Sequence, residues 1–231
     1  MNAFDEYSAH RHVGAITIGQ APRTDVTFDI APLLGSDIEL VEAGALDELD
    51  DFESLAPDND EPVLASRLRD GSSVIVSERR VLPLVQQALD RVAAQGVEAI
   101  ILLCTATGPS ALACSAPIIH PNVVLTQKVV AAAGSDGRVA IVVPDQAQVE
   151  DIKSHWEAVL GRTVDLYVAS PYGPDKPRRI AAEQIAATDA DLVVLDCIGY
   201  SVAMAEEIRR ICGRQVIVPR IAVAEAVKDL L

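Results

Sequence analysis

The chain carries a weak internal repeat, and this repeat restricts the folds that it can adopt. The segment Ala15-Ile16-Thr17-Ile18-Gly19 aligns with Ala140-Ile141-Val142-Val143-Pro144. Each copy is followed by an apolar run that ends in a cysteine, Ile100–Cys104 in the first half and Leu192–Cys197 in the second. Such a repeat predicts two structural units with the same order of elements.

The two halves differ mainly by one insertion. Eighteen residues after each cysteine a β-branched run begins, Asn122–Leu125 and Gln215–Val218. An alanine-rich helix is expected after each run, Gln127–Ala133 and Ile221–Leu231. Ile16 lies 88 residues before Cys104, whereas Ile141 lies 56 residues before Cys197. The difference, 88 − 56 = 32 residues, is about the length of an acidic excursion and a hairpin in the first half.

Short apolar runs alternate with helical patterns along the chain. Several runs are almost continuously apolar, which is typical of parallel strands covered on both faces. The stretches between them, such as Leu84–Gln95 and Gln148–Leu160, have apolar residues at helical spacing. We therefore predict an α/β fold with mostly parallel sheets, arranged as two pseudo-symmetric lobes with a cleft between them. The expected strands are Val13–Ile18, Ile38–Val41, Val97–Cys104, Val123–Leu125, Val139–Val143, Val164–Val168, Leu192–Cys197 and Val216–Val218.

We expect the first lobe to comprise residues 13–136 and 220–231, and the second to comprise residues 137–219. The first lobe includes the excursion and hairpin, residues 45–77. Asp47–Glu61 holds eight carboxylates in fifteen residues, so we expect it to be solvated and exposed. The runs Val63–Arg69 and Ser73–Ser77 flank Asp70-Gly71, which predicts an antiparallel hairpin with a two-residue turn.

Composition excludes several classes of function. Thirty-four acidic residues against 19 basic ones give a net charge of −15, which argues against nucleic-acid binding. No apolar run is long enough to span a membrane, and the polar N-terminus lacks a signal peptide, so we expect a cytoplasmic protein. The cysteines form no CxxC pair, and neither a Walker nor a GxGxxG pattern occurs, so we expect no metal and no cofactor. A homo-oligomer is compatible with these observations.

Cys104 and Cys197 are the candidate catalytic residues. In parallel α/β sheets, ligands bind at the carboxyl ends of the strands, where both cysteines are expected. Two thiols on opposite sides of one cleft would remove a proton from one face of a carbon acid and return it to the other face. The alternative is that both cysteines only fill the core. Cys114 and Cys212 lack the strand-end context, and we assign them to packing within helical segments, Ala111–Ala116 and Ile208–Gly213.

The remaining candidates are substrate-binding residues near the same strand ends. After the first strand, Gly19 and Gln20 lead into a helix expected to begin near Pro22, whose free N–H groups suit an anion. Arg23 is a candidate clamp for a substrate carboxylate, with pairing to Asp25 as the alternative. Thr105 and Thr107 follow the first cysteine, and Gly199, Tyr200 and Ser201 follow the second. For these the alternatives are helix capping and packing.

Several of these segments resemble the AroM family. The segments are Thr17-Ile18-Gly19-Gln20-Ala21-Pro22-Arg23-Thr24-Asp25, Leu102-Leu103-Cys104-Thr105 and Leu195-Asp196-Cys197-Ile198-Gly199-Tyr200. AroM proteins in turn resemble the aspartate/glutamate racemase superfamily, which includes hydantoin racemase, maleate isomerase and arylmalonate decarboxylase. The resemblance implies two α/β lobes and cofactor-independent cysteine chemistry on small carboxylates. The decarboxylases keep one catalytic cysteine, so two cysteines favour the racemase or isomerase side.

The chain departs from the racemase motifs at both cysteines. It has Cys104-Thr105-Ala106 where racemases have Cys-Asn-Thr, and Asp196-Cys197-Ile198 where they have Gly-Cys-Thr. These departures argue against an amino-acid substrate. Our hypothesis is a cofactor-independent racemase or isomerase that acts at the carbon next to a carboxylate. The alternative hypothesis is a non-catalytic protein of the same fold that binds or senses a small carboxylate.

Overall fold

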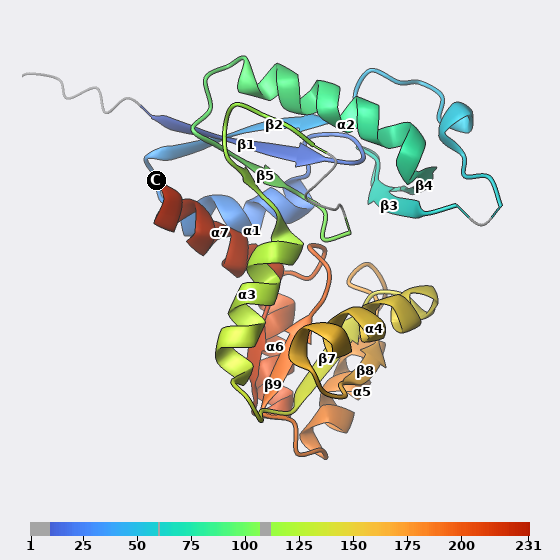
Figure 1. Cartoon of the computed structure of the whole chain (residues 1–231), viewed down its shortest axis with the longest axis vertical. Helices are drawn as coiled ribbons and strands as arrows, with labels where there is room; N and C mark the ends of the chain where they lie inside the picture. Colours follow the sequence, from blue (N-terminus) through green and yellow to red (C-terminus); the bar gives the residue numbers. More distant parts are fainter. Residues whose placement is uncertain (1–9, 60, 107–111) are drawn as a thin grey trace, which may run out of the picture. The chain divides into compact units, whose positions relative to one another are not determined.

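The computed structural model describes residues 10–59, 61–106 and 112–231 (Figure 1). These residues form two compact units. The first contains the described residues up to Leu102, residues 112–118 and Val227–Leu231, and the second contains residues 103–106 and Ile119–Ala226. The second unit therefore starts earlier in the chain than the expected boundary at residue 137. Of the expected C-terminal segment, residues 220–231, only Val227–Leu231 belongs to the first unit.

A four-stranded sheet in the order β2-β1-β5-β6 lies at the centre of the first unit. The central strand β1 pairs in parallel with β2 and with β5. All four residues of β5 are buried, as expected for a continuously apolar strand that is covered on both faces. The strands are β1 (Arg11–Thr17), β2 (Ile38–Gly44), β5 (Ala99–Leu102) and β6 (Ile118–Ile119).

Helices α1 (Thr24–Leu34) and α2 (Glu78–Ala93) pack on this sheet. Ser77 caps α2, because its hydroxyl accepts a hydrogen bond from the Arg80 N–H at 3.4 Å. The close approach of α2 to β1 requires glycine at position 14, where a Cβ atom would lie 2.6 Å from Val92 Cγ1.

The second unit repeats this topology. Its sheet has the order β10-β9-β7-β8, with β7 paired in parallel to β8 and β9. Written from the other edge, β8-β7-β9-β10 corresponds strand for strand to β2-β1-β5-β6, which confirms the internal repeat. The strands are β7 (Val139–Val143), β8 (Asp165–Val168), β9 (Leu192–Leu195) and β10 (Gln215–Ile217).

Two apolar cores lie on opposite faces of the second sheet. Because side chains alternate along a strand, Val139, Ile141 and Val143 face one core, and Ala140 and Val142 face the other. Helices α3 (Pro121–Ala133) and α4 (Val149–Leu160) supply the first core, and α5 (Asp175–Ala186) and α6 (Val202–Cys212) supply the second. The unit is thus a three-layer α/β structure.

The expected strand at Val123–Leu125 is wrong, because these residues lie in helix α3. The strand is β6, a few residues earlier, and Pro121 follows it at the first turn of α3. Burial overrides the β-branched composition, since Leu125, Val129 and Ala133 share one helix face and pack in the core of the second unit. This packing also explains why the chain from Ile119 onward belongs to the second unit.

The hairpin is present, but its turn differs from the expectation. Strands β3 (Val63–Arg67) and β4 (Ser73–Ser77) pair antiparallel, and the loop between them has five residues rather than two. The loop closes with the Leu68 N–H bonded to the Ser72 carbonyl at 2.9 Å. Most described carboxylates of the acidic excursion are exposed as expected, but Asp47 and Glu61 are half-buried.

Candidate active site

Cys104 and Cys197 occupy equivalent positions in the two halves of the chain. Cys104 lies two residues after β5, which ends at Leu102, and Cys197 lies two residues after β9, which ends at Leu195. β5 and β9 have the same place in their sheets. Both cysteines are half-buried. The strand-end placement that the sequence predicted is therefore present in each half.

The loop after β9 wraps a tight turn around the Cys197 thiol. The Gly199 N–H donates to Cys197 Sγ at 3.4 Å, and the Tyr200 N–H donates to the Cys197 carbonyl at 3.2 Å. A backbone N–H directed at sulfur favours the thiolate over the thiol, because the charged form is the stronger acceptor. The loop therefore supports an ionised sulfur at this position.

Gly199 leaves room for the side chains of the loop after β8. A Cβ atom at this position would lie 2.5 Å from Tyr172 Oη and 2.9 Å from Pro171 Cγ. The residue is buried, and the loop after β8 lies against it. Its contribution to the site is the backbone N–H that faces Cys197.

Tyr200 and Ser201 have structural partners. The Tyr200 side chain is fully buried, and its hydroxyl donates to the Ala169 carbonyl at 2.7 Å. Burial raises the pKa of the Tyr200 phenol well above its usual value, so it stays protonated at neutral pH. Ser201 caps α6 by accepting from the Met204 N–H at 3.1 Å. These contacts are the packing and capping roles that the sequence left open as alternatives.

Asp196 is a residue whose partner the sequence analysis missed. Its Oδ2 accepts from the Trp156 Nε1–H of α4 at 2.8 Å. Burial raises the pKa of the Asp196 carboxyl, while the indole N–H and the nearby His155 act in the opposite direction. Trp156 was recognisable as a core residue of a helix, but its indole N–H gave no sequence signal that it would meet the residue before Cys197.

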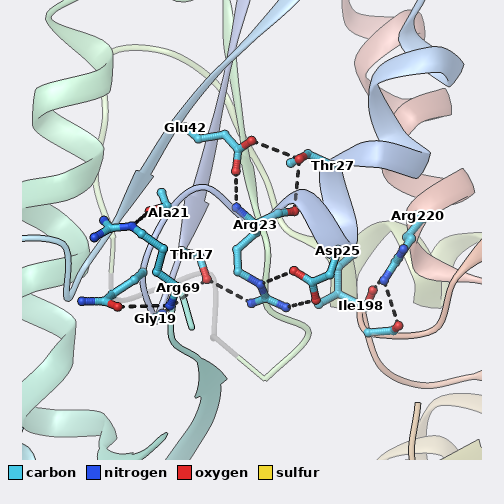
Figure 2. Close-up of polar contacts among 12 residues, drawn as sticks. Thr17, Gly19, Ala21, Arg23, Asp25, Thr27, Glu42, Arg69, Ile198 and Arg220 are labelled. Carbon is cyan, nitrogen blue, oxygen red and sulfur yellow. Dashed lines mark hydrogen bonds and ion pairs between the residues drawn. The ribbon is translucent and has the colours of Figure 1, made fainter. Parts of the chain in front are cut away.

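Arg220, in the first turn of α7 (Pro219–Leu230), is a second missed residue. It is 2% exposed, and its guanidinium donates to the carbonyls of Ile198 and Gly199, both at 2.8 Å (Figure 2). A buried arginine thus holds the backbone of the segment that follows Cys197. Its position 23 residues beyond the cysteine offers no local motif by which to find it.

In the first unit, Gly19 and Gln20 lie just after β1 in the chain and contact the hairpin. The Gln20 N–H donates to the Arg67 carbonyl at 3.2 Å, and its side-chain amide bonds the Leu46 carbonyl and the Arg69 N–H. A Cβ atom at position 19 would lie 2.0 Å from the Arg67 carbonyl oxygen, so this contact requires glycine. Both residues therefore have structural partners among the described residues.

Arg23 is buried at 3% exposure and pairs with Asp25. Its Nε and Nη2 donate to the two Asp25 carboxylate oxygens at 2.8 and 2.9 Å, and Nη1 donates to Thr17 Oγ1 at 3.3 Å (Figure 2). This bidentate pair was the alternative to a carboxylate clamp. The guanidinium face expected for a substrate is thus engaged by a carboxylate of the chain itself.

The N–H groups of this turn are likewise engaged. The Ala21 N–H donates to Asp47 Oδ1 at 2.7 Å, and the Arg23 N–H donates to Glu42 Oε2 at 2.6 Å. The N–H groups of Ala21 and Arg23 are therefore not free, because two carboxylates of the chain bind them. Helix α1 also begins at Thr24 rather than near Pro22, with Arg23 as its N-cap.

The other predicted site residues and cysteines are placed as follows. Thr105 is half-buried directly after Cys104, whereas Thr107 lies outside the described residues. Cys212 is buried in the α5–α6 core, as the packing assignment expected. Cys114 is half-buried, but residues 112–116 are not helical, contrary to the expectation.

Within the described part of the chain, the structure contains no cluster of three histidine, cysteine, aspartate or glutamate residues suited to a metal ion. None of the described helices has the length and hydropathy needed to cross a membrane.

Comparison with known proteins places the chain in a family. The model of the AroM protein family matches residues 13–231, which is nearly the whole chain. The chain belongs to the AroM family. No curated protein matches the sequence significantly.

Solved structures show where the fold occurs. Allantoin racemase from Klebsiella pneumoniae matches with a TM-score of 0.63 at 13% identity, covering 95% of this AroM chain and 87% of the racemase. Unliganded arylmalonate decarboxylase matches with a TM-score of 0.60 at 16% identity, covering 95% of this chain and 92% of the decarboxylase. Glutamate racemase from Francisella tularensis in complex with D-glutamate matches with a TM-score of 0.56 at 14% identity, covering 96% of this chain and 81% of the racemase. The AroM chain thus has the α/β fold of these proteins, with parallel sheets in two sets.

Proposed function

We propose that this AroM protein is a cofactor-independent racemase or isomerase that acts on a small acid, at the carbon next to its carboxylate. The observation that carries the proposal is the matched placement of Cys104 and Cys197, each two residues beyond equivalent strands. Core-filling cysteines have no reason to recur at the same point of both halves. The names of the structural neighbours, which include racemases and a decarboxylase, are consistent with this class of reaction.

The proposed reaction is a proton exchange between two thiols and one carbon. One cysteine, as the thiolate, removes the proton from the carbon, and the electron pair left behind delocalises into the adjacent carboxylate. The other cysteine, as the thiol, donates its proton to the opposite face. The two sulfurs exchange protonation states, so the reaction is balanced without a cofactor.

Carboxylate contacts in this proposal come from the residues that follow the cysteines. Thr105 and the backbone N–H groups beyond each strand end remain candidates, because they lie where parallel sheets bind ligands. Arg23 and the adjacent turn are weaker candidates than the sequence indicated, since Asp25, Glu42 and Asp47 bind their donors.

The proposal is tested by solvent-deuterium exchange. A panel of amino acids, hydroxy acids, hydantoins and malonates, the chiral ones as separate enantiomers, is incubated with protein in D₂O, and loss of the α-proton signal is followed by NMR. We expect catalysed exchange of both enantiomers of at least one chiral panel compound. Cys104→Ser and Cys197→Ser should each lose the exchange of one enantiomer and lose interconversion of the two. Cys114→Ser is the matched control, because this half-buried cysteine lies outside both strand ends, and it should retain exchange.

Binding of panel compounds, as measured by calorimetry, with no proton exchange in any of them would contradict the enzyme proposal. That result would favour the alternative, a protein that binds small carboxylates without turning them over. Loss of exchange in Cys114→Ser as well would mean that the strand-end cysteines have no special role.

A further inference from the structure

Arg220 contacts a peptide unit that also reaches the sulfur of Cys197. Its Nε donates to the Ile198 carbonyl at 2.8 Å. The Gly199 N–H donates to Cys197 Sγ at 3.4 Å. The Ile198 carbonyl and the Gly199 N–H are the two ends of a single peptide group, so one planar unit links the guanidinium to the sulfur.

The geometry of the peptide fixes the direction of this link. In a trans peptide, the C=O and N–H bonds point in opposite directions. When Arg220 holds the carbonyl oxygen, the N–H is directed away from the guanidinium and toward the sulfur. Hydrogen bonds in series polarise one another, so a cation on the oxygen makes the N–H a stronger donor. A second bond, from Nη2 to the Gly199 carbonyl at 2.8 Å, holds the next peptide as well.

We propose that Arg220 is a positioning residue that orients the Ile198–Gly199 peptide and thereby stabilises the thiolate form of Cys197. The inference deepens the proposed function, since it assigns the origin of the reactive sulfur in the second half. Arg220 is assigned no contact with the substrate. The arginine acts through the backbone, at a site that it reaches from the first turn of α7.

The surroundings hold this peptide in place. Tyr172 Oη lies 2.5 Å from the position that a Cβ of residue 199 would take, so the loop after β8 packs against the peptide. Besides Cys197, the ionisable groups that act electrostatically on Tyr200 in this loop are Asp196 and Tyr172, together with Arg178 of α5. All of them remain when Arg220 alone is replaced, so a change in Cys197 reactivity reports on Arg220.

The test measures the sulfur itself and requires no substrate. The full-length protein is treated with iodoacetamide over a range of pH, and alkylation of Cys197 is quantified by peptide mass spectrometry. Cys104 and Cys114 serve as internal references in the same samples. Because only the thiolate reacts, the pH midpoint of alkylation reports on the stability of the ionised sulfur.

In Arg220→Met, we expect the Cys197 midpoint to move to higher pH by about one unit, with alkylation near neutral pH slowed about tenfold. Arg220→Lys keeps the charge and should move the midpoint in the same direction by less. The matched control is Arg162→Met, since Arg162 is a half-buried arginine of this unit that binds the carbonyls of Gly134, Ser135 and Gly137, before the start of β7. Its Cys197 midpoint should equal that of the wild type.

Two results would overturn the inference. One is an unchanged Cys197 midpoint in folded Arg220→Met, or in Arg220→Lys if circular dichroism shows that the methionine variant does not fold. The other is an equal shift in Arg162→Met, which would indicate general loosening of the unit. A specific shift in a protein that exchanges no substrate protons would support the role of Arg220 while the proposed function failed.

Discussion

Replacing Tyr200 by phenylalanine separates a structural role from a ligand-binding role at the Cys197 loop. The Tyr200 hydroxyl is fully buried and donates to the Ala169 carbonyl, which is itself buried. Removing the hydroxyl leaves that carbonyl without this donor, at a cost of about 1–3 kcal/mol. For a chain of this size, about 2 kcal/mol corresponds to a Tm roughly 4–8 °C lower. Ligand affinity should stay unchanged, since the hydroxyl points into the protein.

The assay is urea unfolding followed by the fluorescence of Trp156, the single tryptophan of the chain, which lies in the core of the second unit. Tyr167→Phe is the matched control, because its half-buried hydroxyl pairs with Thr188 near the surface. We expect its unfolding free energy to change by less than about 0.5 kcal/mol. The reasoning fails if Tyr200→Phe loses no more stability than Tyr167→Phe.

Three further substitutions test other parts of the account. Burial raises the pKa of the folded Asp196 carboxyl above its unfolded value, so Asp196 destabilises the fold increasingly as the pH rises above about 4. In urea titrations, the unfolding free energy of Asp196→Asn minus that of the wild type should therefore increase between about pH 4 and 7. A difference that stays constant over this range would refute the argument. Asp47→Ala removes an acceptor of two backbone N–H groups at 2.7 Å and should cost about 2–3 kcal/mol by the same measurement, whereas exposed Glu48→Ala should change stability by less than about 0.5 kcal/mol. Gly19→Ala places a methyl group 2.0 Å from a hairpin carbonyl and should lower Tm by several degrees in a thermal melt, while Gly173→Ala, with 3.5 Å to its nearest neighbour, should melt like the wild type.

The sequence was sufficient for the α/β class and for the repeat, because both depend on local periodicity. Continuous apolar runs predict buried parallel strands, and the strand order of the second sheet mirrors that of the first. It failed at Val123–Leu125, where β-branched residues lie in α3. That choice depends on packing against strands far along the chain, which no local pattern reveals.

The candidate site was predictable only in part. The strand-end placement of Cys104 and Cys197 was predictable because a repeat marks both strand ends. The partners of these loops were not, since Arg220 and Trp156 come from distant helices and act through single polar atoms. The Arg23 turn was misleading for a related reason. Its local sequence suits an anion, but the anions are carboxylates that the fold supplies from β2 and the excursion.

The most direct test of the two-cysteine mechanism compares the two single variants with each enantiomer of a panel compound that the wild type exchanges. If each thiol serves one face of the carbon, Cys104→Ser should exchange the α-proton of one enantiomer with solvent deuterium, and Cys197→Ser that of the other. Affinity for both enantiomers should stay within a small factor of the wild type, since the proton carriers are not the carboxylate contacts. Exchange of the same enantiomer by both variants, or loss of binding in both, would contradict the mechanism.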